Sequence, residues 1–123
     1  MTAAQTTGGQ YTELHRFLQA INEPVDAIWT RFWDWHLLHP SVAGMLFALA
    51  VQARQRGLKR YGIGAIWEVM RWHIVVKEGK TEEFKCSNDY RSRFARFLMW
   101  QHEELAGFFE LRPLRSRRGR EWE

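Results

Sequence analysis

Three side chains near the C-terminal end of the chain have the types and the spacing to bind an anion. Arg93, Arg96 and Trp100 recur at i, i+3 and i+7, so they share one side of a predicted helix, beside its apolar face. A guanidinium can bind phosphate bidentately or contact the edge of guanine, and an indole next to it can stack on a base. Asn88 and Ser92 lie at the N-terminal end of the same helix, where the helix dipole favours anions. This stripe predicts contact with nucleic acid.

A run of arginines follows this helix: Arg112, Arg115, Arg117, Arg118 and Arg120. A basic helix followed by a basic arm is a common arrangement for phosphate contact. The alternative is that the two helix arginines form ordinary surface ion pairs with nearby glutamates, namely Glu82, Glu83, Glu103 and Glu110. The segment before this helix is too long for the turn of a simple helix-turn-helix, so that motif is not predicted.

A second basic patch precedes the fourth predicted helix and consists of Arg54, Arg56, Lys59 and Arg60. Gly62 and Gly64 follow it and would let the backbone approach a ligand closely. The segment lacks the GxxxxGK[ST] pattern and follows a helix rather than a strand, so it is not a phosphate-binding loop of that kind. Its two interpretations are a phosphate contact and a solvated loop between helices.

Metal binding and catalysis have little support in the residue pattern. His36 and His39 lie one helical turn apart and could share a metal with a third ligand from elsewhere, but they sit among Trp and Leu and are better suited to packing. Cys86 is the single cysteine, which excludes an intramolecular disulfide and any zinc site built on several cysteines. No catalytic motif is present, and we expect a protein without a metal, a cofactor or enzymatic activity.

The tryptophans suggest a second class of function. Trp29, Trp33, Trp35 and Trp72 carry more aromatic surface than one small core usually absorbs. If some of them form a contiguous exposed patch, that patch would bind a protein partner or a second copy of the chain. The alternative is that all of them are core residues.

The composition and the net charge limit the classes of function that are possible. The chain has 123 residues, of which 46% are hydrophobic and seven are tryptophan, which excludes disorder for most of its length. The net charge is +4, and it is uneven: residues 1–40 carry two arginines against four carboxylates, so the remainder carries +6. A basic C-terminal two-thirds is typical of contact with nucleic acid, an anionic membrane or an acidic protein. The N-terminus does not resemble a signal peptide and the longest apolar run, 45–51, is too short to span a bilayer, so we expect a soluble cytoplasmic protein with no membrane contact.

The apolar periodicity predicts a mostly α fold, a single compact helical domain of about five helices. We expect a flexible leader over 1–10, the helical domain over 11–115 and an Arg-rich tail over 116–123. The helices are predicted at 11–21, 25–38, 42–56, 63–76 and 89–104. Two short strands, 83–86 and 108–111, could form a β-ribbon near the C-terminus.

Particular residues are predicted to shape these helices. Ser41 is a plausible N-cap, and Gly57 and Gly107 suit the left-handed conformation that often follows a helix. Trp67 and Phe94 lie on the apolar stripes of the two most regular helices, as does Phe97, and all three are expected in the core.

The C-terminal half resembles a group of small bacterial and phage proteins of unknown function. The resemblance consists of an aromatic-Lys-x-[Ser/Asn]-Asn-x-Tyr pattern, then Ala-Arg and, later, Leu-Ala-Gly-Phe-Phe. The matching residues are Phe84, Lys85, Ser87, Asn88, Tyr90, Ala95, Arg96, Leu105, Ala106, Gly107, Phe108 and Phe109. The resemblance implies a bacterial or phage origin and no particular activity.

The sequence therefore favours a non-enzymatic nucleic-acid-binding accessory protein that contacts phosphates of DNA or RNA through a basic helix and an Arg-rich tail. The alternative function is a protein-interaction module, a small inhibitor or adaptor that is homodimeric and uses exposed tryptophans.

Overall fold

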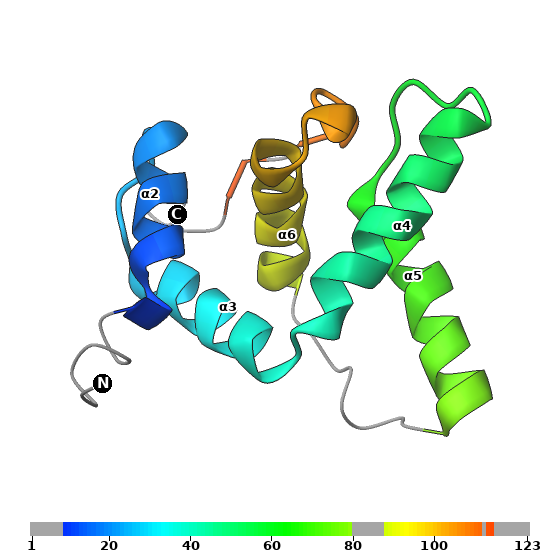
Figure 1. Ribbon diagram of the computed structural model, residues 1–123, viewed down its shortest axis with the longest axis horizontal. Coiled ribbons are helices and arrows are strands. Elements are labelled where there is room, and N and C mark those ends of the chain that lie inside the picture. The colour runs from blue at the N-terminus through cyan, green and yellow to red at the C-terminus, as the bar shows by residue number, and fades with distance from the viewer. Residues whose placement is uncertain (1–8, 80–87, 112, 115–123) are drawn as a thin grey trace.

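The computed structural model describes residues 9–79, 88–111, 113 and 114. This part is mostly helical, as predicted. It contains five α-helices, α2 (Thr12–Ala20), α3 (Ala27–Leu38), α4 (Ser41–Gln55), α5 (Ile63–His73) and α6 (Asn88–Gln101). A π-helical segment, Ile74–Glu78, continues α5, and a short 3-10 turn, Glu103–Leu105, follows α6. Figure 1 shows α6 between two pairs of helices, with α2 and α3 on one side and α4 and α5 on the other.

The core is built around the apolar face of α6. Phe94 and Phe97 are fully buried, and so is Trp67 of α5, which confirms all three predictions. The Phe94 ring meets the Phe32 ring of α3 edge-on, with centroids 4.8 Å apart. Phe97 meets Trp33 of α3 in the same way at 5.2 Å. These rings from α3 and α6 interlock and so fix how α6 is rotated in the core. The same rotation sets the direction of the arginines that flank its apolar face.

The start of α4 differs from the expectation. Its N-cap is Pro40, and Ser41 is the first helical residue and makes no side-chain cap. Pro40 already has the helical φ of −65°, and the backbone N–H of Val42 donates to the His39 carbonyl at 3.1 Å. Proline is pre-organised for the first turn of a helix, so the turn begins one residue earlier than predicted.

The left-handed conformation predicted for two glycines is confirmed, but only one of them directly follows an α-helix. Gly57, with φ +102°, follows α4, and Gly107, with φ +70°, follows the 3-10 turn. The last helix itself ends at Gln101 rather than at residue 104, because the chain tightens into the 3-10 turn.

The first described residues, 9 and 10, belong to the segment predicted as a flexible leader. Residues 9 and 10 are helical, while residues 1–8 lie outside the described part. The Gln10 carbonyl accepts a hydrogen bond from Nε1 of Trp33 at 2.5 Å. The Tyr11 hydroxyl donates to Oδ1 of Asp34 at 2.5 Å, and this hydrogen bond raises the pKa of Tyr11. The start of α2 is therefore tied to α3.

The described residues contain no strand, so the predicted β-ribbon is not supported. Residues 83–86 lie outside the described part. Phe109, in the second predicted strand, forms an isolated parallel bridge with Tyr61 instead. In this bridge the Tyr61 N–H donates to the Phe108 carbonyl at 2.9 Å and the Glu110 N–H donates to the Tyr61 carbonyl at 3.0 Å. The bridge joins the loop between α4 and α5 to the segment after α6.

More of the tryptophan side chains are buried in the core than expected. Trp29 and Trp33 are buried, Trp35 is half-buried, and Trp72 on α5 is 57% exposed. The predicted aromatic patch is therefore reduced to one exposed tryptophan among these four.

In the part of the chain that the structure describes, no single helix has the length and apolar composition to cross a membrane. Helices α3 and α4 have that length and composition only when they are taken together, and this pair is bent by 92°.

Candidate nucleic-acid interface

Arg93 does not lie on an exposed flank, so the prediction that it stands beside the buried face of its helix and is accessible to nucleic acid is wrong. Its side chain has no exposed surface. The guanidinium lies over the Trp29 ring, 4.9 Å from the centroid, and Nη1 donates to the Asp89 carbonyl at 3.1 Å. Burial lowers the pKa of Arg93, and the carboxylates of Asp26 and Asp89 oppose that shift. An arginine keeps its charge under these conditions, so Arg93 is a buried cation that lies over an indole and is attracted by two carboxylates.

Arg93 is buried because α6 lies between two pairs of helices. A stripe beside the main apolar face would be exposed on a helix that packs on one side only. Here α3 covers that stripe at Arg93, because the ring of Trp29 lies over it. The alternative of ordinary surface ion pairs is wrong for Arg93 as well, since the side chain is not at the surface.

Arg96, one turn further along α6, is half-buried and reaches the surface. Its Nη1 donates to the Ser92 carbonyl at 3.2 Å, which fixes the guanidinium along the helix. Burial lowers the pKa of Arg96, and the carboxylate of Glu23 opposes that shift. Ser92 and Trp100 are also half-buried. Two of the three members of the predicted stripe, Arg96 and Trp100, therefore remain accessible in part.

The second basic patch is fully at the surface. Its four side chains, Arg54, Arg56, Lys59 and Arg60, are all exposed. Arg54 lies over the buried ring of Phe108, with its guanidinium carbon 5.9 Å from the centroid. Since Phe108 also accepts the backbone hydrogen bond from Tyr61, both ends of the basic loop are attached to the segment after α6.

The attachment brings the two predicted basic regions together in one hollow, which we call the α2–α6 hollow. It has a volume of about 590 Å³ and lies between the end of α2, the basic loop, α6 and the segment after it. Arg60 of the loop lines it together with Arg96 and Trp100 of α6. Among the described residues that line it, Glu23 is the only acidic one, against these two arginines. The hollow therefore combines an indole with a net positive charge.

A neighbouring hollow of about 450 Å³, the α5–α6 hollow, has a balanced charge. Arg91 and Arg96 line it, but so do Asp89 and Glu110. Nη2 of Arg91 lies 3.8 Å from Oε2 of Glu68, and its guanidinium carbon lies 5.6 Å from the centroid of the Trp67 ring. This hollow is less suited to an anion than the α2–α6 hollow, because two carboxylates offset its two guanidiniums.

Sequence reasoning missed the apolar side of the α2–α6 hollow. Ile21, Met99 and Phe109 line it beside Trp100. Met99 lies between the predicted residues Arg96 and Trp100 on the same helix, so helical spacing could have identified it. Ile21 and Phe109 belong to other elements, and no local pattern connects them to α6.

The remaining predicted site residues are divided between the helix start and the tail. Asn88 is the first residue of α6. The predicted tail contacts lie outside the described residues: Arg112, Arg115, Arg117 and Arg118.

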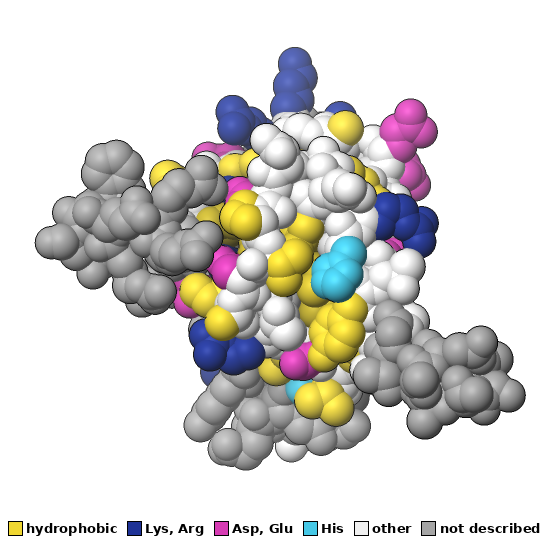
Figure 2. All heavy atoms as spheres, turned by 90° about the vertical axis from the view of Figure 1, so that its left-hand side faces the viewer, with side chains coloured by type: hydrophobic (Ala, Val, Ile, Leu, Met, Phe, Trp, Pro, Cys, Tyr) yellow, Lys and Arg dark blue, Asp and Glu magenta, His cyan; other side chains and the backbone are white. Residues whose placement is uncertain are grey.

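Figure 2 shows the face that bears α2, with Lys and Arg side chains projecting at the end of the molecule where the α4–α5 loop lies in Figure 1. Apolar and acidic side chains also appear on this face, so it is not uniformly basic. Further Lys and Arg side chains appear at the right margin and toward the lower left of this view.

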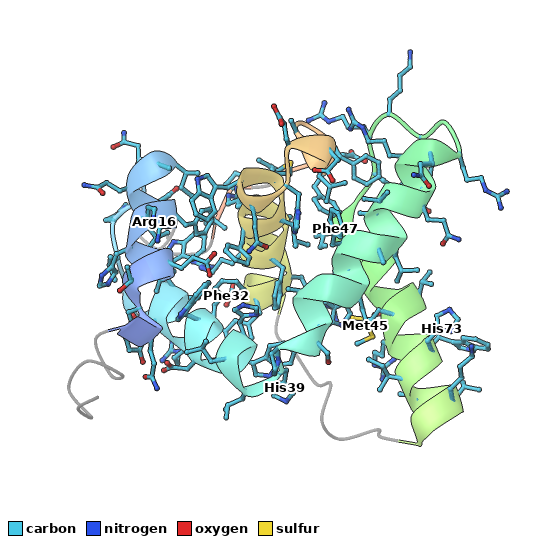
Figure 3. All side chains as sticks on the ribbon, viewed as in Figure 1. Arg16, Phe32, His39, Met45, Phe47 and His73 are labelled. Carbon is cyan, nitrogen blue, oxygen red and sulfur yellow. The ribbon has the colours of Figure 1, made fainter. Side chains whose placement is uncertain are left out.

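The histidines are placed for packing. His39 stacks on Trp35 with centroids 4.1 Å apart, and Phe47 stacks on His102 at 3.8 Å. Figure 3 shows His39 at the end of α3 and His73 well away from it on α5. Within the described part of the chain, no group of three His, Cys, Asp or Glu side chains could hold a metal ion.

Comparison of the chain with protein families, curated proteins and solved structures finds no match.

Proposed function

We propose that the protein is a non-enzymatic accessory protein that binds nucleic acid through the basic α4–α5 loop and the outer side of α6. One observation carries the proposal: Arg60 of the loop and Arg96 of α6 line the same hollow as Trp100. Two separate basic regions that converge on one aromatic side chain are suited to a ligand with both phosphates and bases. Arg93 has no part in this contact.

The exposed loop cations extend the surface beyond the hollow. Arg56 and Lys59 are exposed beside Arg60 and can reach successive phosphates of a strand. Each phosphate that such a cation neutralises releases condensed counterions, so the affinity should fall as salt increases.

The test is fluorescence anisotropy with labelled single- and double-stranded DNA and RNA over a salt series. We expect binding that weakens steeply with salt. The double variant Arg60→Ala/Arg96→Ala should lower the affinity and make the salt dependence shallower, by about 0.9 in the logarithmic slope for each lost contact on duplex DNA. The matched control is Arg16→Ala/Arg31→Ala, which removes the same charge from two exposed arginines on α2 and α3.

Two results would contradict the proposal. The first is no binding to any of the four nucleic acids at protein concentrations on the order of tens of micromolar, within the usual range of non-specific affinity. The second is an equal loss of affinity in the two double variants, because binding would then depend on net charge and not on the hollow.

Association with a protein is a second candidate function. Val69, Trp72 and Val76 are spaced by three and four residues along α5 and its π-helical continuation, and they are 45%, 57% and 58% exposed. An apolar stripe of this kind is suited to packing against another protein or a second copy of the chain. It lies on a different helix from the residues of the α2–α6 hollow.

A further inference from the structure

The α2–α6 hollow has two kinds of wall. Ile21, Met99, Trp100 and Phe109 give it an apolar wall, and Arg60 and Arg96 place guanidiniums at the same hollow. A volume of about 590 Å³ lies within the range of about 300 to 1,000 Å³ that small-molecule sites occupy. A ligand that matches both walls has a planar apolar part and an anionic part close to each other.

Trp100 is a well-supported platform for a planar group. Its ring is half-buried and packs inward on Phe17 at 5.3 Å and on Phe97 at 6.1 Å between centroids. Phe17 and Phe97 are themselves buried, so the indole is held from behind by the core. A rigid aromatic side chain loses little conformational entropy when a base stacks on it, and base stacking does not depend strongly on which base is present.

Each cation comes from a segment that a backbone contact fixes at the hollow. Arg96 is fixed along α6 by its hydrogen bond to the Ser92 carbonyl. Arg60 directly precedes Tyr61, whose backbone is paired with the segment after α6. Two guanidiniums near one aromatic ring can hold the phosphate that adjoins a stacked base, because guanidinium forms charge-assisted hydrogen bonds to phosphate.

We infer that the α2–α6 hollow seats one unpaired base of a single-stranded nucleic acid on Trp100, with the adjoining phosphate held by Arg60 and Arg96. The inference rests on the proposed function and adds the class of ligand. In a duplex the faces of each base are covered by its neighbours, so a paired base cannot enter the hollow without unstacking. The protein therefore prefers single strands to duplexes.

The experiment separates base contact from phosphate contact. The affinity of the full chain is measured at one salt concentration for a short oligothymidylate, for an abasic oligomer with the same number of phosphates, and for a duplex with that number of phosphates per strand. We expect the oligothymidylate to bind roughly tenfold or more tightly than the abasic oligomer, since stacking of one base is worth about 1 to 3 kcal/mol.

A variant that fills the hollow tests its location without disturbing the core. Ala106 lines the hollow and is exposed, so Ala106→Phe adds a ring there while Trp100 and both arginines stay in place. We expect this variant to retain the wild-type midpoint of thermal unfolding and to lose the preference for oligothymidylate over the abasic oligomer. The matched control is Ala48→Phe, at an exposed position of α4, which should keep the preference.

The failures of the two proposals are distinguishable. Equal affinity of the wild-type protein for the oligothymidylate and the abasic oligomer would overturn the base site and leave the phosphate contact intact. A preference that survives Ala106→Phe would overturn the location of the site. If no oligomer binds, the proposed function itself is wrong, and the base site fails with it.

Discussion

The guanidinium of Arg93 lies over the ring of Trp29, 4.9 Å from its centroid and without exposed surface, between α6 and α3. Arg96, on the next turn of the same helix, lines two surface hollows. Two arginines three residues apart therefore have different roles, and the predictions below separate them.

Replacement of Arg93 should affect stability and not binding. Arg93→Ala leaves a cavity beneath Trp29 and removes the cation–π contact, so we expect the free energy of unfolding to fall by about 3 kcal/mol. Arg93→Met keeps most of the volume without the buried charge and should lose less. Chemical denaturation measures both. If folded Arg93→Met bound nucleic acid as weakly as Arg96→Met does, Arg93 would have to reach the ligand after all.

Phe94 should be among the most sensitive core positions. It is fully buried and its ring contacts Phe32 and Trp35 of α3 and Trp67 of α5. Phe94→Ala should lower the free energy of unfolding by about 3 to 5 kcal/mol, because a cavity replaces a ring that links two helices to α6. Trp72→Ala, at an exposed position, is the control and should cost less than about 1 kcal/mol. A small loss at Phe94 would mean that α6 faces another way.

His36 should make stability depend on pH. Its ring lies between Trp33 and Phe97, with centroids 4.9 and 5.5 Å away, and burial lowers its pKa below the ordinary value of 6.5. The unfolded chain therefore binds the proton more readily than the folded chain. The stability that this neutral histidine contributes is complete above about pH 6.5 and is lost as the pH falls below that value toward the lowered pKa.

Thermal unfolding at about pH 7.5 and about pH 5.5, on either side of the ordinary histidine pKa, measures this effect. His36→Phe keeps an aromatic ring without a titrating group and should reduce the difference between the two midpoints. His15→Gln, at an exposed position of α2, is the control and should leave the difference unchanged. An unchanged difference in His36→Phe would assign the pH dependence to other groups.

The apolar stripe on α5 predicts self-association. If the stripe formed by Val69, Trp72 and Val76 packs against a second copy, the purified protein should sediment as a dimer at high concentration. Trp72→Glu would place a charge in that contact and should give a monomer with unchanged stability, because the side chain is 57% exposed in the single chain. A wild-type protein that is monomeric at every concentration tested would exclude a homodimer and leave only a different protein as partner.

Most of the helical fold could be predicted from the sequence because helical periodicity is local. Apolar residues at i, i+3 and i+4 give a helix one apolar side, and this identified Phe94, Phe97 and Trp67 as core. Gly57, which has a positive φ, marked the end of α4. The N-cap of α4 was missed because Pro40 competes with Ser41 for the start of the first turn.

The site was less predictable, because it depends on contacts between elements. The sequence by itself determined that Arg96 and Trp100 share one side of a helix and that a basic loop precedes α5. It could not determine that Arg93 is covered by Trp29, since burial of a flank requires a neighbour on that side. Only the tertiary structure decided that Arg60 and Arg96 line the same hollow, because the bridge between Tyr61 and Phe109 joins segments far apart in the chain, and no periodicity within either segment encodes that pairing.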